Sequence, residues 1–304
     1  MTPVTIGGIP IGDGHPCRIV CEIGTNHQGD VDLAKWLART AKDVGCDFVK
    51  LQVRTPMLAV PEAEWDDVRD TPWGKMGKLE YRRKVELSDA DLISFNDFCE
   101  AAGIPWFTSV WDIQALERLH GLPIDFIAVK IPSARLHDDE LLRRVARYGR
   151  PVILSTGMSE WVAVKRAWSI LRDQFDADSK FQWRRMAQII PMQCTSAYPA
   201  RHDESNLRVI QTYKHEFGGP VGFSSHKIGI ATCLLAVAVG ANLIERHITW
   251  DRSAKGSDHR MSSTGEDLKR LVQEIRYAEA CLGTGAKRIE QSEMAEAVRL
   301  RGSA

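Results

Sequence analysis

Two histidines end two short apolar segments, and each follows a polar residue by two positions. Ser224 and His226 belong to the segment VGFSSH, and Glu245 and His247 belong to NLIERH. Side chains alternate across a strand, so each polar pair shares one strand face. If the two segments are neighbouring parallel strands, two imidazoles, a carboxylate and a hydroxyl meet at their carboxyl ends. This pattern predicts a divalent-ion site on His226 and His247, although either histidine could instead be a hydrogen-bonded core group.

Two lysines lie inside otherwise apolar segments, Lys50 in FVKLQV and Lys130 in FIAVKI. Burying an ammonium group is costly unless it meets an anion, so these lysines predict an anionic ligand. Three serines, Ser133, Ser155 and Ser224, end or follow apolar segments of the same kind. Each alone could be a turn hydroxyl, but around two lysines they are suited to donate hydrogen bonds to a phosphate or carboxylate.

Eight segments of strand character alternate with helical segments along the chain. The predicted strands are Arg18–Gly24, Phe48–Val53, Trp106–Trp111, Phe126–Ile131, Pro151–Gly157, Ala187–Cys194, Val221–His226 and Asn242–His247. This alternation predicts an α/β protein, a (β/α)8 TIM barrel, with a short hairpin within residues 3–16. A doubly wound sheet is the alternative, but the turn GTNHQG after the first strand lacks the G-x-G-x-x-G pattern.

Loops after the strands build the active site of such a barrel, so polar residues at strand ends are candidates. Glu22 is near the end of the first strand, and Gln52 shares a face with Lys50. Gln193 ends the sixth strand and Tyr198 follows it. Residues 54–87 are too many for an ordinary strand–helix connection, which predicts either a cover for the site or a surface excursion.

The composition is that of an ordinary globular chain of 304 residues, with 44% hydrophobic and 26% charged residues. Forty basic and forty acidic residues cancel, so neither nucleic acid nor a membrane surface is expected as a partner. The seven cysteines show no CxxC spacing, which favours free thiols in a reducing compartment. No leader or long apolar run is evident, so a cytoplasmic location is predicted.

Several motifs together resemble the N-acetylneuraminate (sialic acid) synthase family, from about residue 17 to residue 302. They include CEIGTNHQGD, VKIPSA, ILSTGM, CTSAYP, GFSSHKIGI and IERHITWDRSAKGSDHRMS. The resemblance implies a transferase that joins phosphoenolpyruvate to a sugar aldehyde and releases phosphate. The acceptor would be N-acetylmannosamine or a related aldose or N-acyl hexosamine, and the product a nine-carbon 2-keto-3-deoxy acid.

The resemblance also assigns roles to single residues. It implies His226 and His247 as metal ligands, with Mn²⁺ as the first choice and Co²⁺ or Mg²⁺ as alternatives. Glu22, Lys50, Lys130, His226 and His247 are the predicted catalytic residues. The positions implied around phosphoenolpyruvate are Lys50, Lys130, Ser133, Ser155, Ser224 and Glu245. Those implied around the acceptor sugar are Glu22, Gln52, Tyr198 and Asp258.

The chain also departs from the family pattern. Arg135 stands where relatives usually have an acid, and relatives continue into a small antifreeze-like domain that reaches over a partner's barrel. We expect a barrel with its hairpin over residues 1–283 and a tail resembling that linker over residues 284–304. A homodimer is predicted.

Two other functions stay open. A Schiff-base aldolase would use Lys50 or Lys130, and a non-catalytic barrel would only bind a sugar acid.

Overall fold

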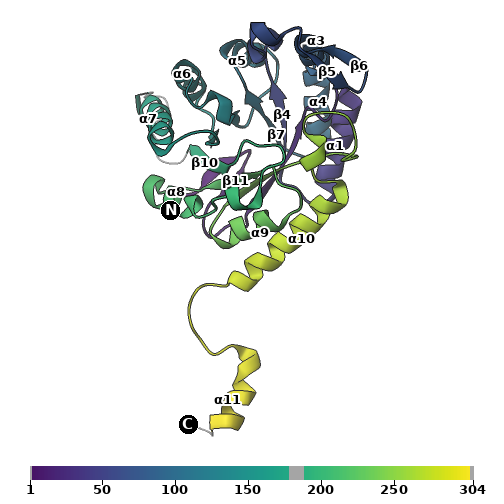
Figure 1. The fold of residues 1–304 in the computed structure, drawn as a ribbon. Helices are drawn as coiled ribbons and strands as arrows, with labels where there is room; N and C mark the ends of the chain where they lie inside the picture. Colours follow the sequence, from purple (N-terminus) through teal and green to yellow (C-terminus); the bar gives the residue numbers. More distant parts are fainter. Residues whose placement is uncertain (1, 178–187, 302–304) are drawn as a thin grey trace.

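Eight parallel strands close into a barrel, and helices cover it from outside (Figure 1). The computed structural model describes residues 2–177 and 188–301. In order around the barrel the strands are β3 (Arg18–Gly24), β4 (Phe48–Val53), β7 (Trp106–Val110), β8 (Val129–Ile131), β9 (Val152–Ser155), β10 (Ile189–Cys194), β11 (Gly222–Ser225) and β12 (Leu243–His247). The last strand pairs with the first, which places His247 opposite Glu22. The predicted (β/α)8 barrel is confirmed.

The predicted strands overlap the observed ones, with two clear shortenings. The fifth was predicted over Pro151–Gly157, but β9 covers only Val152–Ser155. The fourth was predicted over Phe126–Ile131, but β8 begins only at Val129. The ring of Phe126 packs edge-on against Trp106, with the centroids 5.2 Å apart, outside the ladder. The predicted start of the sixth strand, Ala187, lies outside the described residues.

Local signals fix the ends of several barrel helices. Asp30 accepts hydrogen bonds from the first amides of α1 (Val31–Asp43). Ser88 forms a capping box at the start of α4 (Asp89–Ala102), and Thr264 does the same for α10 (Gly265–Leu282). The other helices between strands are α5 (Ile113–His120), α6 (Asp139–Arg147), α7 (Trp161–Ala177), α8 (Val209–Phe217) and α9 (Ala231–Ala238).

The hairpin predicted within residues 3–16 is present, and it closes the amino-terminal end of the barrel. Its strands are β1 (Val4–Ile6) and β2 (Ile9–Ile11), paired antiparallel. Val4, Ile6 and Ile11 are fully buried in one apolar cluster with inward side chains of the barrel strands, among them Phe48 and Phe107. This end of the barrel is therefore filled with apolar side chains, which leaves the opposite end for a polar site.

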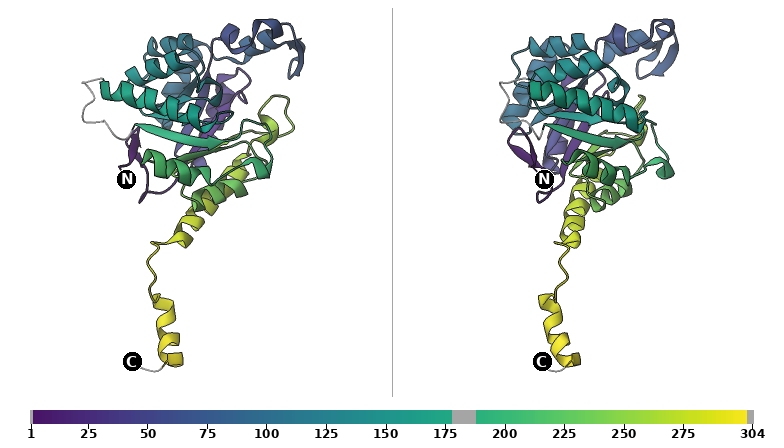
Figure 2. Two further views of the ribbon diagram at one scale, coloured as in Figure 1. Left: turned by 60° about the vertical axis from the view of Figure 1, so that its left-hand side comes forward. Right: turned by 90° about the vertical axis from the view of Figure 1, so that its left-hand side faces the viewer.

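The long connection after β4, residues 54–87, has secondary structure of its own. It contains α2 (Pro56–Ala59), a hairpin of β5 (Val68–Thr71) and β6 (Gly74–Gly77), and α3 (Lys78–Val85). In Figure 2 this excursion stands out at one end of the barrel. An ion pair between Lys255 Nζ and Asp70 Oδ2, at 3.2 Å, links its hairpin to the loop after β12.

The last barrel helix ends at Leu282, and a connecting segment leads to α11 (Met294–Arg301). Both views of Figure 2 show α11 standing away from the barrel. Among the described helices, none combines the length and apolar character that a membrane crossing requires.

Candidate active site

The carboxyl-terminal half of the barrel interior is polar. The inward side chains there are Glu22, Lys50, Ser109, Lys130, Ser155, Ser224 and Glu245, and each is at least nine-tenths buried. They form the next inward layer toward the carboxyl ends of the strands, since Lys50 and Ser109 follow Phe48 and Phe107 of the apolar layer by two positions. The outward residues Val49, Leu51 and Val53 pack in the cluster beneath the helices, so the predicted alternation along β4 is confirmed.

Four of these inward groups form one charged network. Lys50 Nζ lies 2.5 Å from Glu22 Oε2 and 3.7 Å from Glu245 Oε1, and Lys130 Nζ lies 2.5 Å from Glu245 Oε1. The two carboxylates neutralise the two ammonium groups. The protein thus supplies anions to Lys50 and Lys130 itself, so burial of these lysines does not by itself require an anionic ligand, and the predicted ligand stays a prediction.

The pKa values of the two carboxylates of the network shift in opposite directions. Burial raises the pKa of Glu22, and the attraction of Lys50 only partly opposes this effect. Burial also acts on Glu245, but Lys130 and Lys50 outweigh it and hold the pKa of this carboxyl at about 2. Glu22 is thus the better placed of the two to take up a proton, while Glu245 stays ionised.

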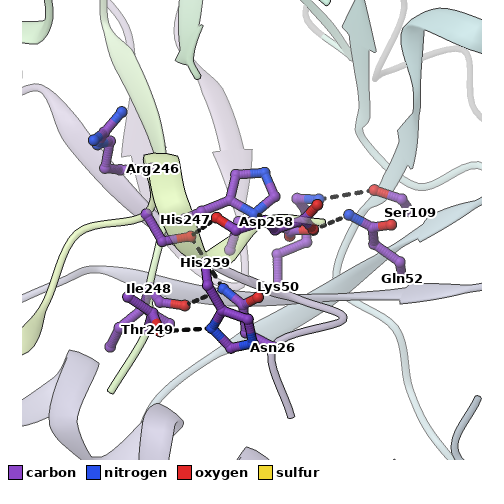
Figure 3. Close-up of polar contacts among 12 residues, drawn as sticks. Asn26, Lys50, Gln52, Ser109, Arg246, His247, Ile248, Thr249, Asp258 and His259 are labelled. Carbon is purple, nitrogen blue, oxygen red and sulfur yellow. Dashed lines mark hydrogen bonds and ion pairs between the residues drawn. The ribbon is translucent and has the colours of Figure 1, made fainter. Parts of the chain in front are cut away.

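Gln52 and Ser109 extend the charged network by hydrogen bonds, and two of its oxygen atoms stay unpaired. Gln52 donates a hydrogen bond to Glu22 Oε1, and Lys50 donates to Ser109 Oγ at 2.8 Å (Figure 3). Glu245 Oε2 and Gln52 Oε1 are buried and accept no hydrogen bond in the described part of the chain. Buried polar atoms are almost always paired in folded proteins, so these two indicate a place for a ligand or water.

The two predicted metal ligands lie side by side at the mouth of the barrel. The ring centroids of His226 and His247 are 5.6 Å apart. Nδ1 of His226 is 2.8 Å from the Thr195 carbonyl, which can only accept, so Nδ1 carries the proton and Nε2 keeps its lone pair. Burial lowers the pKa of His226 to about 3 and that of His247 to about 4. Both imidazoles are therefore neutral at pH 7, the form that binds a metal.

Asp258 and Tyr198 flank the two imidazoles. Asp258 Oδ2 is 3.7 Å from His247 Nδ1, too far for a hydrogen bond, and this buried nitrogen has no partner among the described residues. Tyr198 stacks on His226 with the ring centroids 4.2 Å apart. Gly24 makes this packing possible, because its φ is +60° and an added Cβ would lie 2.9 Å from Asp258 Oδ2.

The donor set fits an open metal site rather than a closed one. Among the described residues, no group of three or more His, Cys, Asp or Glu side chains could hold a metal ion together. Two neutral imidazoles supply two ligands and leave the remaining positions to water or substrate oxygen. That arrangement suits the predicted Mn²⁺, Co²⁺ or Mg²⁺, and both the metal itself and the choice of ion stay predictions.

Serine hydroxyls and one backbone amide line the side of the mouth near β8, β9 and β10. Ser133 Oγ accepts a hydrogen bond from the Gly157 amide at 3.0 Å and lies 3.2 Å from Cys194 Sγ. Ser224 donates to Glu245 Oε1 at 3.2 Å, and Ser155 is buried at the end of β9. A cavity of about 700 Å³ lies beside this wall, where Gly157 and Cys194 face Trp161 of α7 and Tyr213 of α8; none of the four charged network residues lines it.

Comparison with known proteins agrees with this geometry. Residues 37–287 match the NeuB family. The chain belongs to the NeuB family. Mouse N-acetylneuraminate-9-phosphate synthase is 36% identical to it over 288 residues, which are 94% of this chain and 76% of the mouse protein. The N,N'-diacetyllegionaminic acid synthase of Legionella pneumophila is 35% identical over 294 residues, covering 95% of this chain and 80% of its own.

Solved structures support the same assignment. The N-acetylneuraminic acid (sialic acid) synthetase of Leptospira borgpetersenii, in complex with citrate, superposes with a TM-score of 0.85 and 28% identity. The match covers 99% of this chain and 98% of that one. A truncated 3-deoxy-D-arabino-heptulosonate 7-phosphate synthase from Thermotoga maritima shares the fold at a TM-score of 0.68 and 17% identity. The predicted family, the fold and the prediction of an enzyme are confirmed, whereas the dimer and the cytoplasmic location stay predictions.

Two side chains that matter in this NeuB-family site escaped the sequence analysis. Ser109 of β7 accepts a hydrogen bond from Lys50, and no site residue was predicted on the third strand. Arg246 is fully buried on the outer side of β12 and donates to Ser225 O, Ser263 Oγ and Met261 O at 2.8–3.0 Å. It fixes the loop that carries Asp258. A charged residue inside an apolar strand was the available signal, the same one that identified the two lysines.

The prediction for Gln193 needs correction, and the structure gives the positions of Arg135 and Asn26. Gln193 was expected at the site, but it faces outward and donates to Ser205 O at 3.1 Å, because alternation along β10 turns Cys194 inward instead. Arg135 lies at the excursion, with its guanidinium 3.4 Å from the Leu58 carbonyl. Asn26 joins the loops after β3 and β12 by donating to Ile248 O at 2.7 Å (Figure 3).

Proposed function

We propose that this NeuB-family enzyme condenses phosphoenolpyruvate with a sugar aldehyde and releases inorganic phosphate, with the help of a divalent metal. The acceptor is N-acetylmannosamine or a related aldose, and the product is a sialic-acid-type nonulosonate. The observation that carries the proposal is the network of Glu22, Lys50, Glu245 and Lys130 directly beside two neutral imidazoles. The relatives, which are named as synthases of such acids, point the same way.

Charge explains why both the lysines and a metal belong in this site. Phosphoenolpyruvate carries nearly three negative charges, whereas the network of two lysines and two glutamates sums to zero. A divalent ion on His226 and His247 would make the site positive, and Lys50 and Lys130 are already placed to share their hydrogen bonds with a phosphate or carboxylate. Ser133, Ser155 and Ser224 add hydroxyl donors.

The reaction forms one bond between C3 of the enolpyruvate and the aldehyde carbon. The aldehyde oxygen takes up a proton, water adds at C2, and the C2–O bond to the phosphate group then breaks. When bound, the metal supplies Lewis acidity that polarises the aldehyde oxygen. Glu22, whose pKa is raised by burial, is placed to hold or pass a proton, and Gln52 fixes the orientation of its carboxylate. Lys130 and Ser224 keep Glu245 in place.

Phosphate release tests this proposal directly. The enzyme is incubated with phosphoenolpyruvate, Mn²⁺ and a panel of aldoses and N-acyl hexosamines, and products are identified by mass spectrometry. We expect release that depends on the acceptor, stops with chelator and is lost in His226→Ala. His215→Ala is the matched control, because the His215 side chain is 88% exposed on α8.

Each rival predicts a different result. A Schiff-base aldolase keeps its activity in chelator and is trapped on Lys50 or Lys130 by borohydride with substrate. A non-catalytic barrel binds phosphoenolpyruvate but releases no phosphate with any acceptor. Turnover by His226→Ala equal to that of the parent enzyme would refute the metal role.

The names of the relatives leave one feature of the acceptor undetermined. The mouse synthase is named for a 9-phosphate product, whereas the Legionella synthase is named for an acid without phosphate. A nine-carbon product contains three carbons from phosphoenolpyruvate, so its ninth carbon is the sixth carbon of the acceptor.

A further inference from the structure

The indole N–H of Trp111 is a buried donor without an acceptor. Within the part of the chain that the structure describes, nothing accepts a hydrogen bond from its Nε1 atom. Buried indole N–H groups usually find a partner. Trp106, at the start of the same strand, follows this rule by donating to Asn96 Oδ1 at 3.1 Å. The exception at Trp111 therefore indicates a place for an oxygen atom that the chain itself does not supply.

Trp111 lies on the inner wall of the barrel mouth, directly after β7. Ser109 of this strand faces the charged network, whereas Val110 packs outside, beneath the helices. The backbone amide of Trp111 donates to the Val53 carbonyl at 3.3 Å, which continues the pairing of β7 with β4. Alternation therefore turns the Trp111 side chain inward, one step beyond Ser109 toward the open end. The guanidinium of Arg54 covers its ring, 4.5 Å from the centroid.

This wall lies across the mouth from the predicted metal ligands. In the closed order of eight strands, β7 is four strands away from β11, which His226 follows, and three away from β12, which ends at His247. Figure 3 shows His247 and Ser109 on opposite sides of the Lys50 ammonium group. A sugar whose aldehyde lies at the two imidazoles therefore extends its far carbons toward Trp111.

The surroundings of Trp111 decide the kind of group that it binds. The charge of Arg54, which stacks on the ring, is compensated by Glu86, with Nη1 and Oε1 3.2 Å apart. On the neighbouring strand β4, the buried Gln52 Oε1 also lacks a partner among the described residues. A donor and an acceptor left open on adjacent strands match a sugar hydroxyl, which both accepts and donates a hydrogen bond.

Resting on the proposed function, we propose that Trp111 is an acceptor-binding residue for a hydroxyl group on the far half of the sugar, at C4, C5 or C6. The indole N–H donates to that hydroxyl oxygen, while the aldehyde at C1 lies at the metal site. A methylene group in the same place would leave the N–H buried without a partner. The contact therefore selects acceptors that carry this hydroxyl.

The kinetic test removes the N–H and keeps an aromatic ring. Trp111→Phe still presents a ring to Arg54, but it has no donor. We expect kcat/KM for the acceptor to fall about 5- to 30-fold, mainly through KM for the acceptor, while KM for phosphoenolpyruvate changes by less than about 2-fold. Trp36→Phe is the matched control, because Trp36 is 52% exposed on α1, and its kinetics should equal those of wild type.

A double-mutant cycle on binding identifies the hydroxyl and does not depend on turnover. N-acetylmannosaminitol has no aldehyde and cannot react, so calorimetry with saturating phosphoenolpyruvate and Mn²⁺ measures its affinity alone. In the wild-type enzyme, one of the 4-, 5- and 6-deoxy alditols should bind about 5- to 30-fold more weakly than the parent alditol. In Trp111→Phe the same deoxygenation should weaken binding by less than about 2-fold, because the donor to that oxygen is gone.

These measurements separate the inference from the proposed reaction. Coupling between Trp111 and one hydroxyl supports the inference even if no acceptor gives phosphate release, in which case the proposed reaction alone fails.

Three results would overturn the inference. In the first, the wild-type enzyme binds none of the alditols or binds all four equally well. In the second, Trp111→Phe binds every alditol as tightly as wild type does. In the third, Trp111→Phe weakens binding of all four by the same factor, which indicates a structural role for Trp111. Thermal melting of each variant checks that the fold is retained.

Discussion

The charged network makes a quantitative prediction about stability, tested by replacing Lys130 with methionine. Removing Lys130 takes away the 2.5 Å ion pair of Glu245, a buried carboxylate only 1% exposed. Breaking a buried pair on one side costs about 3–5 kcal/mol of folding free energy. Glu245 would still have Ser224 at 3.2 Å and Lys50 at 3.7 Å, so we expect a cost shifted below that range, about 2–4 kcal/mol.

The double variant Lys130→Met/Glu245→Met provides the decisive comparison. It removes both charges and leaves Lys50 with Glu22 at 2.5 Å and Ser109 at 2.8 Å. Apolar side chains of similar volume replace a buried ion pair at little net cost, so the double variant should lie within about 1 kcal/mol of wild type. Both variants should be inactive, so the double variant should combine lost activity with a stability close to that of wild type.

Urea denaturation at pH 7, followed by circular dichroism, gives these free energies of unfolding. Arg144→Met is the surface control, because the pair of Arg144 with Glu117 is exposed and should be worth less than about 1 kcal/mol. The folded-state pKa of Glu245, about 2, is below its ordinary value, so the stability from this pair is present above pH 4.5 and is lost as the pH falls toward 2. The gap between wild type and Lys130→Met should narrow over that interval. A double variant as unstable as the single one would refute the reasoning.

Two further predictions concern backbone approach and loop position. Gly157→Ala should raise KM for phosphoenolpyruvate about 10-fold or more, because the added Cβ would lie 2.4 Å from Ser196 Oγ and 3.0 Å from Ser133 Oγ. Gly219→Ala is the control, since its Cβ would lie in open space and steady-state kinetics should not change. Equal kinetics for the two variants would contradict a phosphate site beside Gly157. Arg246→Met removes hydrogen bonds to Ser225, Ser263 and Met261, so urea denaturation should show a loss of about 2–4 kcal/mol, and a loss below 1 kcal/mol would count against its anchoring role.

Periodicity along single strands determined much of this site before any contact was known. Alternation in FVKLQV places Lys50 inward and Val49 and Leu51 outward, and the structure confirms both. The same rule brings Glu245 and His247 to one face of β12. Helix starts at Asp30 and Ser88 were also predictable, because a cap acts on amides only two or three residues away. These features depend on neighbours in the chain, which a sequence shows directly.

Only the tertiary structure decided which groups pair across the barrel. Lys130 could have met a ligand as well as a protein carboxylate, and closure of the barrel brings it to Glu245, 115 positions further along the chain. The same closure brings Ser109 within hydrogen-bonding distance of Lys50 and sets β12 beside β3. Spacing fixes the side of a strand on which a residue lies, but a buried charge takes its partner from whatever distant segment the fold places within about 3 Å.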